Sequence, residues 1–360
     1  MSALALIACR GLSPLRAWTA FLALALAGVT AEVSATAQRT FVSGKCADTN
    51  ACTISAPCRS IVAAIAQTNT GGEVIVLDSA GYGPFAISKS ISIIAAPGVY
   101  AGVSVTAVGT QIAVDVEGSA TTVVLRGLSI NASGGGGIGI NFLNAKALTV
   151  DRCRVSGFLT GIFQNGGVMT VRDTTVSDGG VNHQGVVLYG GVATLERVAI
   201  ARTGTGIAVS GNAALAMRSG TISDVAEDGI RAQNLASVSI DDVVISNSAD
   251  TGIYAFGDTG TPYIDIIRSQ IVGAVFYGVV VSTLLTNNAV VHVTDSLISE
   301  NGVGVATFLG GHASLSGNTI VNNGIGVYSP NSGTSTYQNN QVRENPSGDT
   351  GGTINPRTFK

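Results

Sequence analysis

Short apolar runs alternate with glycine and polar residues along most of the chain, and the pattern repeats. From Val123 onward the repeated unit is an apolar residue, any residue, an apolar residue, four variable positions and a final apolar residue. The period is about 24 residues. The final apolar residue of successive units is Ile130, Val155, Val176, Ile200, Ile222, Ile245, Ile271, Ile298, Ile320 and Val342.

A second series lies between these positions, in which glycine precedes a β-branched residue. Each pair opens a segment of four or five residues that alternates with period 2 and ends near glycine, as in "GIAVSG" and "GIYAFG". Such segments predict short buried strands and exclude helices. The β-branched residues are Ile140, Ile162, Val186, Ile207, Ile230, Ile253, Val279, Val305 and Val327.

Several short strands in a repeat of two dozen residues cannot bury their apolar faces alone. Coiling the chain stacks each strand on its equivalent one turn later, at about 4.8 Å, and merges the inward residues into one core. The leucine-x-leucine consensus of leucine-rich repeats is missing. The pattern therefore predicts a single all-β domain, a parallel β-solenoid.

Charged residues, only 11% of the chain, follow the same period. The residue after the middle apolar position alternates in sign over six coils, and the next residue does so with gaps. Opposite charges on neighbouring coils predict structural ladders that favour the correct stacking register. The two series are Arg126, Asp151, Arg172, Glu196, Arg218 and Asp241, and Arg152, Asp173, Arg197, Ser219, Asp242, Arg268 and Asp295.

The N-terminus has the features of a secretory signal peptide. Two arginines precede the apolar run Ala17–Val29, and small residues of the A-x-A type end at Ala37. We assign residues 1–37 to the signal, 38–70 to a disulfide segment with a capping helix, 71–345 to the solenoid and 346–360 to a tail without a strand pattern. A secreted or periplasmic location follows.

Composition excludes some partners. The net charge is −3 and no basic patch stands out, which argues against nucleic acid. After the signal no apolar run approaches the 18 residues that a membrane-spanning helix needs. A polysaccharide or a protein remains as the expected partner.

Cysteine usage suits an oxidising compartment. Cys46, Cys52 and Cys58 lie within a short polar segment, and three thiols without a nearby histidine are one ligand short of a zinc site. We favour a Cys52–Cys58 disulfide, with Cys46–Cys58 as the alternative. Cys153 lies in the apolar stack and is expected to be a buried thiol.

The repeat and its entry segment, residues 57–98, resemble the right-handed parallel β-helix proteins of the pectate-lyase-like superfamily. The resemblance covers about residues 60–345 and implies a single-stranded right-handed β-helix of about 10–12 coils. It also implies a short helix at about Ser60–Gln67 that covers the open end of the core. Uncapped coils would expose both core and strand edges.

Enzymes of that superfamily carry their chemistry on an outward strand face, and their short motifs are missing here. Only the adjacent pair Asp241 and Asp242 matches one of them, and the ladders already account for that pair. The histidines, His183, His292 and His312, are expected to be solitary surface residues, the last of them in a turn.

One charge cluster lies outside the ladders. Glu227 and Asp250 occupy the same position on adjacent coils, with Asp228 beside them and Arg231 on the following strand. Two carboxylates without an intervening base could provide a general acid of raised pKa. They could also bind calcium as a cofactor through their oxygen atoms. A solvated bend is the structural alternative.

The outward positions of the Gly-Ile strands are mostly apolar. Sugar stacking, a covering loop or a partner chain would each explain exposed aromatic residues there, namely Tyr189, Tyr254, Phe256, Phe308 and Tyr328. We favour a non-catalytic binding or structural module of the cell envelope or surface, for polysaccharide or protein. The alternative is a polysaccharide lyase or glycoside hydrolase for an acidic polysaccharide, with its site around Glu227 and Asp250.

Overall fold

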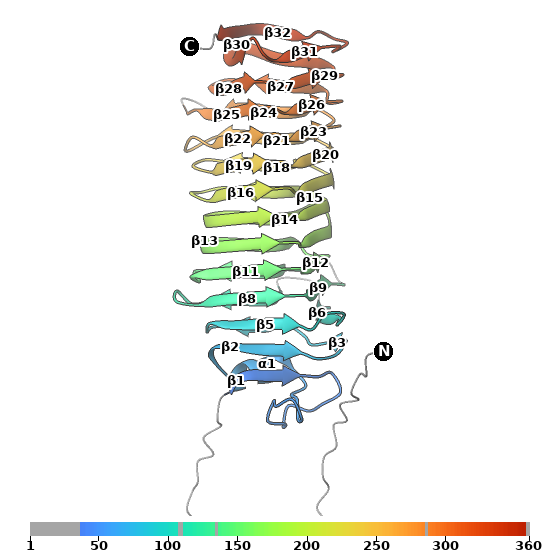
Figure 1. Ribbon diagram of the computed structural model, residues 1–360. Coiled ribbons are helices and arrows are strands. Elements are labelled where there is room, and N and C mark those ends of the chain that lie inside the picture. Colours follow the sequence, from blue (N-terminus) through green and yellow to red (C-terminus); the bar gives the residue numbers. More distant parts are fainter. Residues whose placement is uncertain (1–36, 107–110, 134–135, 285–286, 358–360) are drawn as a thin grey trace, which may run out of the picture.

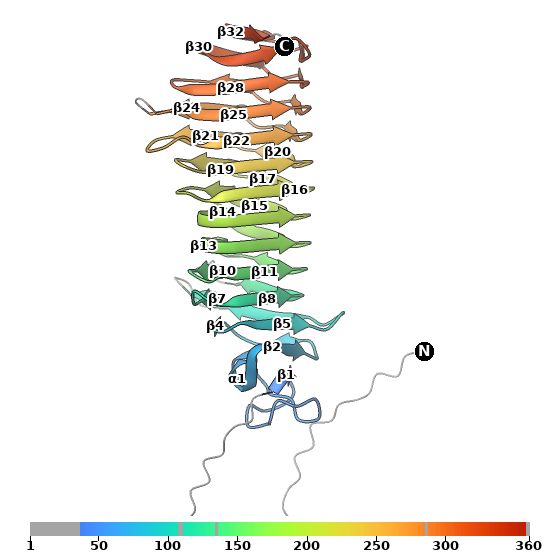
Figure 2. The same cartoon turned by 60° about the vertical axis from the view of Figure 1, so that its left-hand side comes forward.

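The computed structural model describes residues 37–106, 111–133, 136–284 and 287–357. The chain forms a straight stack of about 12 turns in which every strand pairs in parallel with its equivalents in the neighbouring turns (Figure 1). Turning the view shows the same ladder of strands on a second side of the stack (Figure 2). The predicted all-β parallel solenoid is therefore confirmed, whereas the expected signal peptide, apart from Ala37, lies outside the described residues.

The strands form three faces, which we name A, B and C. Face A contains β4 (Phe85–Ile87), β7 (Ile112–Glu117), β10 (Ile138–Leu143), β18 (Ile230–Gln233), β21 (Thr251–Gly257), β24 (Tyr277–Thr283) and β27 (Val303–Thr307). Face B contains β1 (Ala37–Val42), β2 (Thr68–Val76), β5 (Ile91–Ala95), β8 (Thr122–Arg126), β11 (Ala147–Asp151), β16 (Ala214–Arg218), β19 (Ser237–Asp241), β22 (Tyr263–Ile267), β25 (Ala289–Thr294) and β28 (Gly311–Ser316).

Face C contains β3 (Ala80–Gly81), β6 (Ala101–Val105), β9 (Leu128–Ala132), β12 (Arg154–Ser156), β17 (Thr221–Val225), β20 (Val244–Ser248), β23 (Gln270–Val272), β26 (Leu297–Ser299), β29 (Thr319–Val321) and β31 (Gln341–Arg343). Five strands continue around corners and contribute to two or three faces. These are β13 (Thr160–Arg172), β14 (Thr175–Glu196), β15 (Ala199–Val209), β30 (Ile325–Tyr337) and β32 (Thr350–Arg357).

The two apolar series of the sequence form the core. On face A, Ile140 pairs with Ile162 and Ile162 with Val186, and all three are fully buried. Period-2 alternation sends these residues inward on every coil, so each stacks on the branched side chain of the next. The hydrophobic interior thus runs the length of the stack as one column.

The glycine before each branched residue is required by close packing between coils. A Cβ on Gly229 would lie 2.5 Å from the carbonyl oxygen of Gly252 and 2.5 Å from Cγ2 of Ile245. The same contact with the next coil recurs at Gly161, Gly185, Gly206, Gly252, Gly278 and Gly304. Glycine at this corner therefore permits the strand spacing that the core needs.

Buried asparagines bond the later coils together at the corner after face C. The Asn301 backbone N–H and amide both donate to Asn323 Oδ1, at 3.0 and 2.9 Å, and Asn323 donates in the same way to Asn345. Asp349 accepts from Asn345 and ends the ladder. Each amide supplies partners for backbone groups that the corner leaves outside the strand ladders.

The helix α1 (Ile61–Gln67) lies at the N-terminal end of the stack, as a cap requires (Figure 2). Ser60 begins it by accepting a hydrogen bond from the Ala63 N–H, and Ile61 and Ala64 are buried toward β1 and β2. The solenoid was expected to begin at residue 71, after this helix, but β1 precedes the helix and pairs with β2. The Cys52–Cys58 disulfide is present, and Cys153 is a buried free thiol whose pKa burial raises to about 11.

The C-terminal segment differs from the prediction. Residues 346–360 carry no alternating apolar pattern, yet Thr350–Arg357 form β32 and pair with β30. Only its Ile354 is an apolar residue packed on the core. Backbone pairing with an existing strand, rather than side-chain burial, accounts for this last strand.

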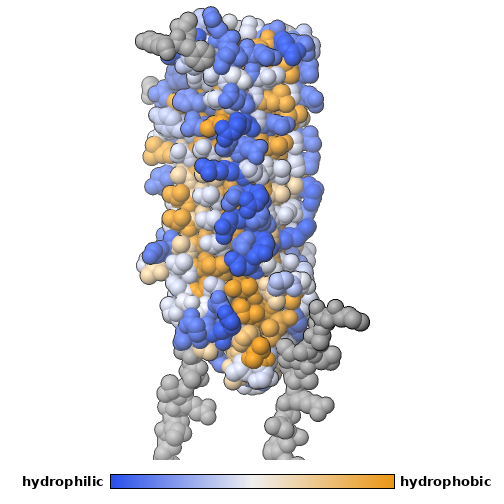
Figure 3. Space-filling model, viewed as in Figure 1, coloured by the Kyte–Doolittle hydropathy of each residue, from blue (hydrophilic) through white to orange (hydrophobic). Residues whose placement is uncertain are grey.

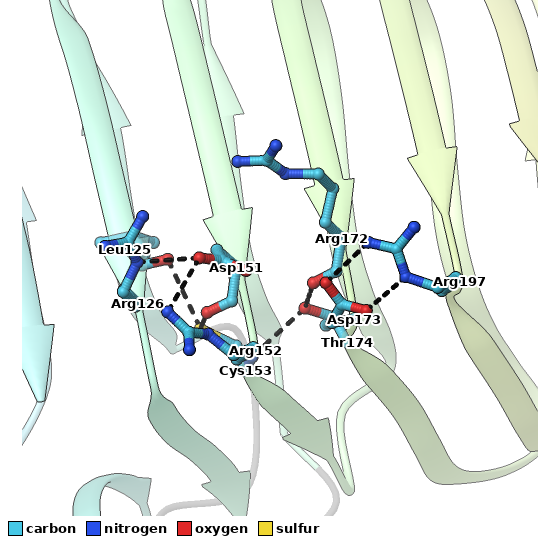
Figure 4. A network of polar contacts seen from close by, with 9 residues as sticks. All are labelled: Leu125, Arg126, Asp151, Arg152, Cys153, Arg172, Asp173, Thr174 and Arg197. Carbon is cyan, nitrogen blue, oxygen red and sulfur yellow. Dashed lines mark hydrogen bonds and ion pairs between the residues drawn. The ribbon is translucent and has the colours of Figure 1, made fainter. Parts of the chain in front are cut away.

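The charge ladders have the predicted register, and part of them forms ion pairs. Asp151 lies between Arg126 and Arg172 on neighbouring coils and accepts a 2.8 Å bond from Arg126 Nε (Figure 4). Asp173 accepts hydrogen bonds from Nε and Nη2 of Arg197 on the next coil, at 2.6 and 3.0 Å. The Arg197 guanidinium holds the pKa of Asp173 below its usual range.

Two features of the ladders were not foreseen. Glu196 bonds to Arg197 in its own coil, not to the arginines stacked on it. The second series also lies in the left-handed backbone region, with φ of 51° at Arg152 and 52° at Arg197. That conformation strains a long side chain, so the interactions between coils offset a local cost.

Candidate functional site

The charge cluster outside the ladders lies at the bend where the chain passes from face C to face A. The backbone N–H of Glu227 donates to Gly204 O, and that of Asp250 donates to Glu227 O at 3.1 Å. Glu227 and Asp250 are thus stacked on adjacent coils, as the spacing predicted. Gly229 follows Asp228 and lacks a side chain, so the backbone at the start of β18 can lie close to Gly252 on the next coil.

Asp228 is the buried member of this cluster, with a side chain 1% exposed. Arg231 Nε donates to Asp228 Oδ2 at 2.6 Å, while Asp228 Oδ1 is buried without a hydrogen-bond partner in the described part of the chain. Burial raises the pKa of Asp228 to about 6, against the opposing effect of Arg231. Nearby Asp250 and Glu227 add to the rise.

The two outer acids have polar partners. Glu227 Oε2 accepts a 2.9 Å bond from the Thr205 hydroxyl and lies 3.5 Å from Arg231 Nη2, and Thr251 donates to Asp250 Oδ1 at 3.2 Å. Arg231 reaches back to Glu227 and Asp228, and no ion pair with Asp250 is found among the described residues, so the expected pair of Glu227 and Asp250 without an intervening base stays a prediction. Arg231 neutralises part of the cluster's charge.

The cluster can act chemically only through its outer members. A ligand at the surface would meet Arg231 and Glu227, whose side chains are 31% and 41% exposed, before it met Asp228. In the described ranges no group of three or more His, Cys, Asp or Glu side chains is arranged to hold a metal ion. The geometry therefore provides a cation–carboxylate pair at the surface above a buried acid.

Five aromatic side chains follow the same face toward the C-terminus, and we name them the face A aromatic surface: Tyr254, Phe256, Tyr277, Phe308 and Tyr328. The Tyr254 and Phe256 rings are 5.6 Å apart, and Phe308 lies 5.9 Å from Tyr277 and 6.0 Å from Tyr328. Tyr277 was missed in the sequence because it falls before the glycine of its coil.

Tyr189, the fifth aromatic residue expected there, lies apart. It sits at a shift in the register between β13 and β14 and is 58% exposed. Three coils separate it from Tyr254, since Val187 pairs with Ala208, Ala208 with Arg231 and Arg231 with Tyr254. The structure therefore removes Tyr189 from the group.

Apolar residues fill the space between the aromatic rings. Tyr254, Val280, Ala306 and Tyr328 occupy equivalent outward positions on four successive coils, and the middle two are buried. Neighbouring side chains therefore cover part of this face. Exposed apolar residues at the two edges extend it, namely Phe276, Leu284 and Leu309.

Face B carries more polar side chains, beside the exposed Val168, Val192 and Tyr263. The view onto the strands of this face shows hydrophilic residues gathered in a band along the stack (Figure 3). Asp265 and His292 are paired there on adjacent strands, and the Asp265 carboxylate lies 3.1 Å from His292 Nδ1. His292 is thus not the solitary histidine that the sequence suggested, and His312 lies in β28 rather than in a turn. The spacing of 27 residues between Asp265 and His292, one coil of this part of the chain, could have predicted the pairing.

Comparison with known proteins supports the architecture. Residues 160–320 match the family model described as the right handed beta helix region. The fold resembles the A-module of a mannuronan C-5 epimerase from Azotobacter vinelandii, at 16% identity and a TM-score of 0.57 over 80% of this chain and 89% of that one. No curated protein sequence matches the chain significantly.

Two further solved structures show the same fold. The Dettilon tailspike protein aligns at 14% identity and a TM-score of 0.53, over 82% of this chain and 65% of that one. A lacto-N-biosidase from Eubacterium ramulus aligns at 11% identity and a TM-score of 0.53, over 89% of this chain and 67% of that one. These likenesses show the fold of the chain, a right-handed parallel β-helix.

Proposed function

We propose that this protein is an exported, non-catalytic β-helix that binds a polysaccharide chain along the face A aromatic surface. The observation that carries the proposal is the run of five aromatic rings over successive coils, flanked by exposed Phe276, Leu284 and Leu309. Contiguous apolar surface of this kind is uncommon unless it binds something. Aromatic rings suit the apolar faces of sugar units, and tyrosine adds a hydroxyl.

The dimensions of the surface suit an extended ligand. Tyr254 and Tyr328 are three coils apart, about 14 Å at the usual strand spacing. Polar groups at one end would orient the chain, since Arg231 is paired in register with Tyr254 and Ser282 donates to the Tyr254 hydroxyl at 3.2 Å. A ligand of several linked sugar units fits this arrangement better than a compact one.

The similar structures support a carbohydrate partner. Their names describe a mannuronan C-5 epimerase and a lacto-N-biosidase, both of which act on carbohydrates. Because identity is at most 16% for these two, the likeness concerns the scaffold. We infer from it only that β-helix faces of this shape accommodate sugar chains.

Export follows from the N-terminal pattern and is supported by the Cys52–Cys58 disulfide, which suits an oxidising compartment. No helix in the described ranges is long and apolar enough to cross a membrane. We place the working protein in the periplasm or outside the cell.

A catalytic alternative rests on Asp228. A buried carboxyl with a pKa of about 6, held by Arg231 next to Glu227, has the acid strength of a general acid. Its burial argues against direct contact with a substrate. The alternative predicts that the protein turns over an acidic polysaccharide and that Glu227→Ala and Asp250→Ala abolish this turnover. Ultraviolet absorbance would detect the unsaturated products of a lyase, and new reducing ends would detect hydrolysis.

Affinity electrophoresis tests the binding proposal. The folded protein, without its signal, is run in gels that contain neutral or uronate polysaccharides, beside Tyr254→Ala and Tyr328→Ala. We expect retardation by at least one polysaccharide and at least about tenfold weaker binding in each variant. Tyr100→Ala is the control, because Tyr100 is 51% exposed and lies far along the stack. Retardation that neither variant reduces would contradict the proposal.

A further inference from the structure

A concave site lies on face B near the C-terminal end of the stack. It is a groove of about 310 Å³ to which strands of four successive coils contribute, namely β25, β28, β30 and β32. Its lining consists of Val290, His292, His312, Ala313, Ser314, Gly333, Ser335 and Arg357. None of these residues belongs to the charge cluster or to the face A aromatic surface.

The register of face B explains which side chains meet in the groove. Asp265, His292, Ser314 and Ser335 occupy the same outward position on four successive coils. Spacing of about 4.8 Å between coils sets the imidazole and the two hydroxyls side by side. His312 stands in the neighbouring column, paired with Val290.

Small residues make this part of the surface hollow. Gly333 has no side chain, and Ser314 and Ser335 are short, so the floor is low between the imidazoles and the long side chain of Arg357. Val290 provides an apolar patch at the other end. A site with hydroxyl donors, an apolar wall and a cation has the composition of a small-ligand pocket.

The charges of the groove point to an anion. Arg357 and His312 have no carboxylate within ion-pair distance in the part of the chain that the structure describes, although other exposed arginines, such as Arg197 and Arg202, are paired. Asp265 is engaged with His292 Nδ1 and thereby orients the ring, leaving Nε2 for a ligand. The groove thus holds one unpaired guanidinium, two imidazoles and two hydroxyls.

We propose that this groove binds an oxyanion, a carboxylate, sulfate or phosphate group carried on a small polar ligand. Arg357 supplies the planar fork that matches such groups, the His312 imidazole and the Ser314 and Ser335 hydroxyls donate to the remaining oxygens, and Val290 contacts the apolar part. His292 donates through Nε2 only as an imidazolium, because its Nδ1 faces the Asp265 carboxylate. The proposal is independent of polysaccharide binding on face A, because the two sites share no residue.

Calorimetric titration tests the site with three probes: inorganic sulfate, inorganic phosphate and glucuronate. We expect saturable binding of at least one of them, weakened about tenfold or more in both Arg357→Gln and His312→Gln. The tightest probe identifies the class of oxyanion. Both side chains are exposed, so each variant is expected to keep the wild-type Tm.

Arg343→Gln is the matched control, because Arg343 is an exposed arginine of a nearby coil that is paired with Glu344. Binding that falls equally in this control would show general attraction of anions to surface arginines and would overturn the proposal. Absence of binding for all three probes, or unchanged binding in both groove variants, would also overturn it.

Discussion

Arg231 Nε lies 2.6 Å from Asp228 Oδ2, yet the pKa of Asp228 is raised to about 6. An arginine partner alone would lower that pKa. Burial outweighs it, because the carboxyl is removed from water and Oδ1 receives no bond within the described residues. The pair therefore joins a cation that stays charged to an acid that is costly to ionise.

The first prediction concerns the pH dependence of stability. The folded state holds the Asp228 proton up to about pH 6, whereas the unfolded chain releases it near 4. Between these values the folded state binds more protons, so this group's contribution to the free energy of unfolding falls as pH rises. Relative to that of Asp228→Asn, the free energy of unfolding of the wild type should fall by up to about 3 kcal/mol between pH 4 and pH 6.5.

Urea unfolding of both proteins across that pH range measures the difference. Other carboxylates, such as Asp173, whose pKa is lowered, titrate equally in both proteins and cancel. A difference between wild type and Asp228→Asn that stays constant from pH 4 to 6.5 would show that Asp228 has an ordinary pKa.

The second prediction concerns the charge ladder. Asp151→Ala removes the acceptor of Arg126 and the neighbour of Arg152 at 3.5 Å, at a position that is largely buried. We expect unfolding to become easier by about 1–3 kcal/mol. Glu196→Ala, whose exposed partner Arg197 keeps Asp173, should cost less than about 1 kcal/mol. Equal losses in the two variants would argue against a special role for the Asp151 pair.

The third prediction concerns the glycine corner. Gly229→Ala places a methyl group 2.5 Å from the Gly252 carbonyl, so two coils must separate or the bend must deform. We expect a loss of at least about 3 kcal/mol, or failure to fold. Gly81→Ala, where nothing lies within 4 Å of the new methyl group, should change stability by less than about 1 kcal/mol. Thermal unfolding compares them, and a tolerant Gly229 would refute the account of this corner.

The fourth prediction concerns the asparagine ladder. Asn323 is fully buried, and its amide donates to the backbone oxygens of Ile298 and Val321 while its Oδ1 accepts from Asn301. Asn323→Leu leaves these groups unpaired and should cost about 2–5 kcal/mol. Asn339→Ala, at an exposed position whose side chain bonds only to Ser316 among the described residues, should cost less than about 0.5 kcal/mol. Similar urea midpoints for both variants would contradict this role.

The fold could be predicted from the sequence because every coil of the solenoid repeats the same pattern of apolar positions. Ile140, Ile162 and Val186 are equivalent in the sequence and become neighbours in the stack, so periodicity directly gives the contacts. The tail escaped prediction, since β32 is held by backbone pairing that leaves no apolar pattern. The asparagine ladder also escaped it, although Asn301, Asn323 and Asn345 recur every 22 residues.

The candidate sites were less predictable, because side-chain reach decides them. Stacking of Glu227 on Asp250 follows from the period, but the return of Arg231 toward Asp228 depends on a rotamer. The pairing of Asp265 with His292 required aligning coils of 27 residues, longer than the mean repeat. Val280 and Ala306 occupy outward positions and are nevertheless buried, which the alternating pattern of a single coil does not predict.

Hydroxyl-radical footprinting with the tightest-binding polysaccharide tests the central claim most directly. It reports which side chains a ligand covers, so the binding surface is located without mutation. Binding on face A predicts that oxidation of Tyr254, Phe256 and Tyr328 falls at least about threefold on saturation, with Tyr100 and Tyr189 unchanged. Protection of Tyr100 or Tyr189 with unchanged oxidation on face A would place the ligand elsewhere and contradict the proposed function.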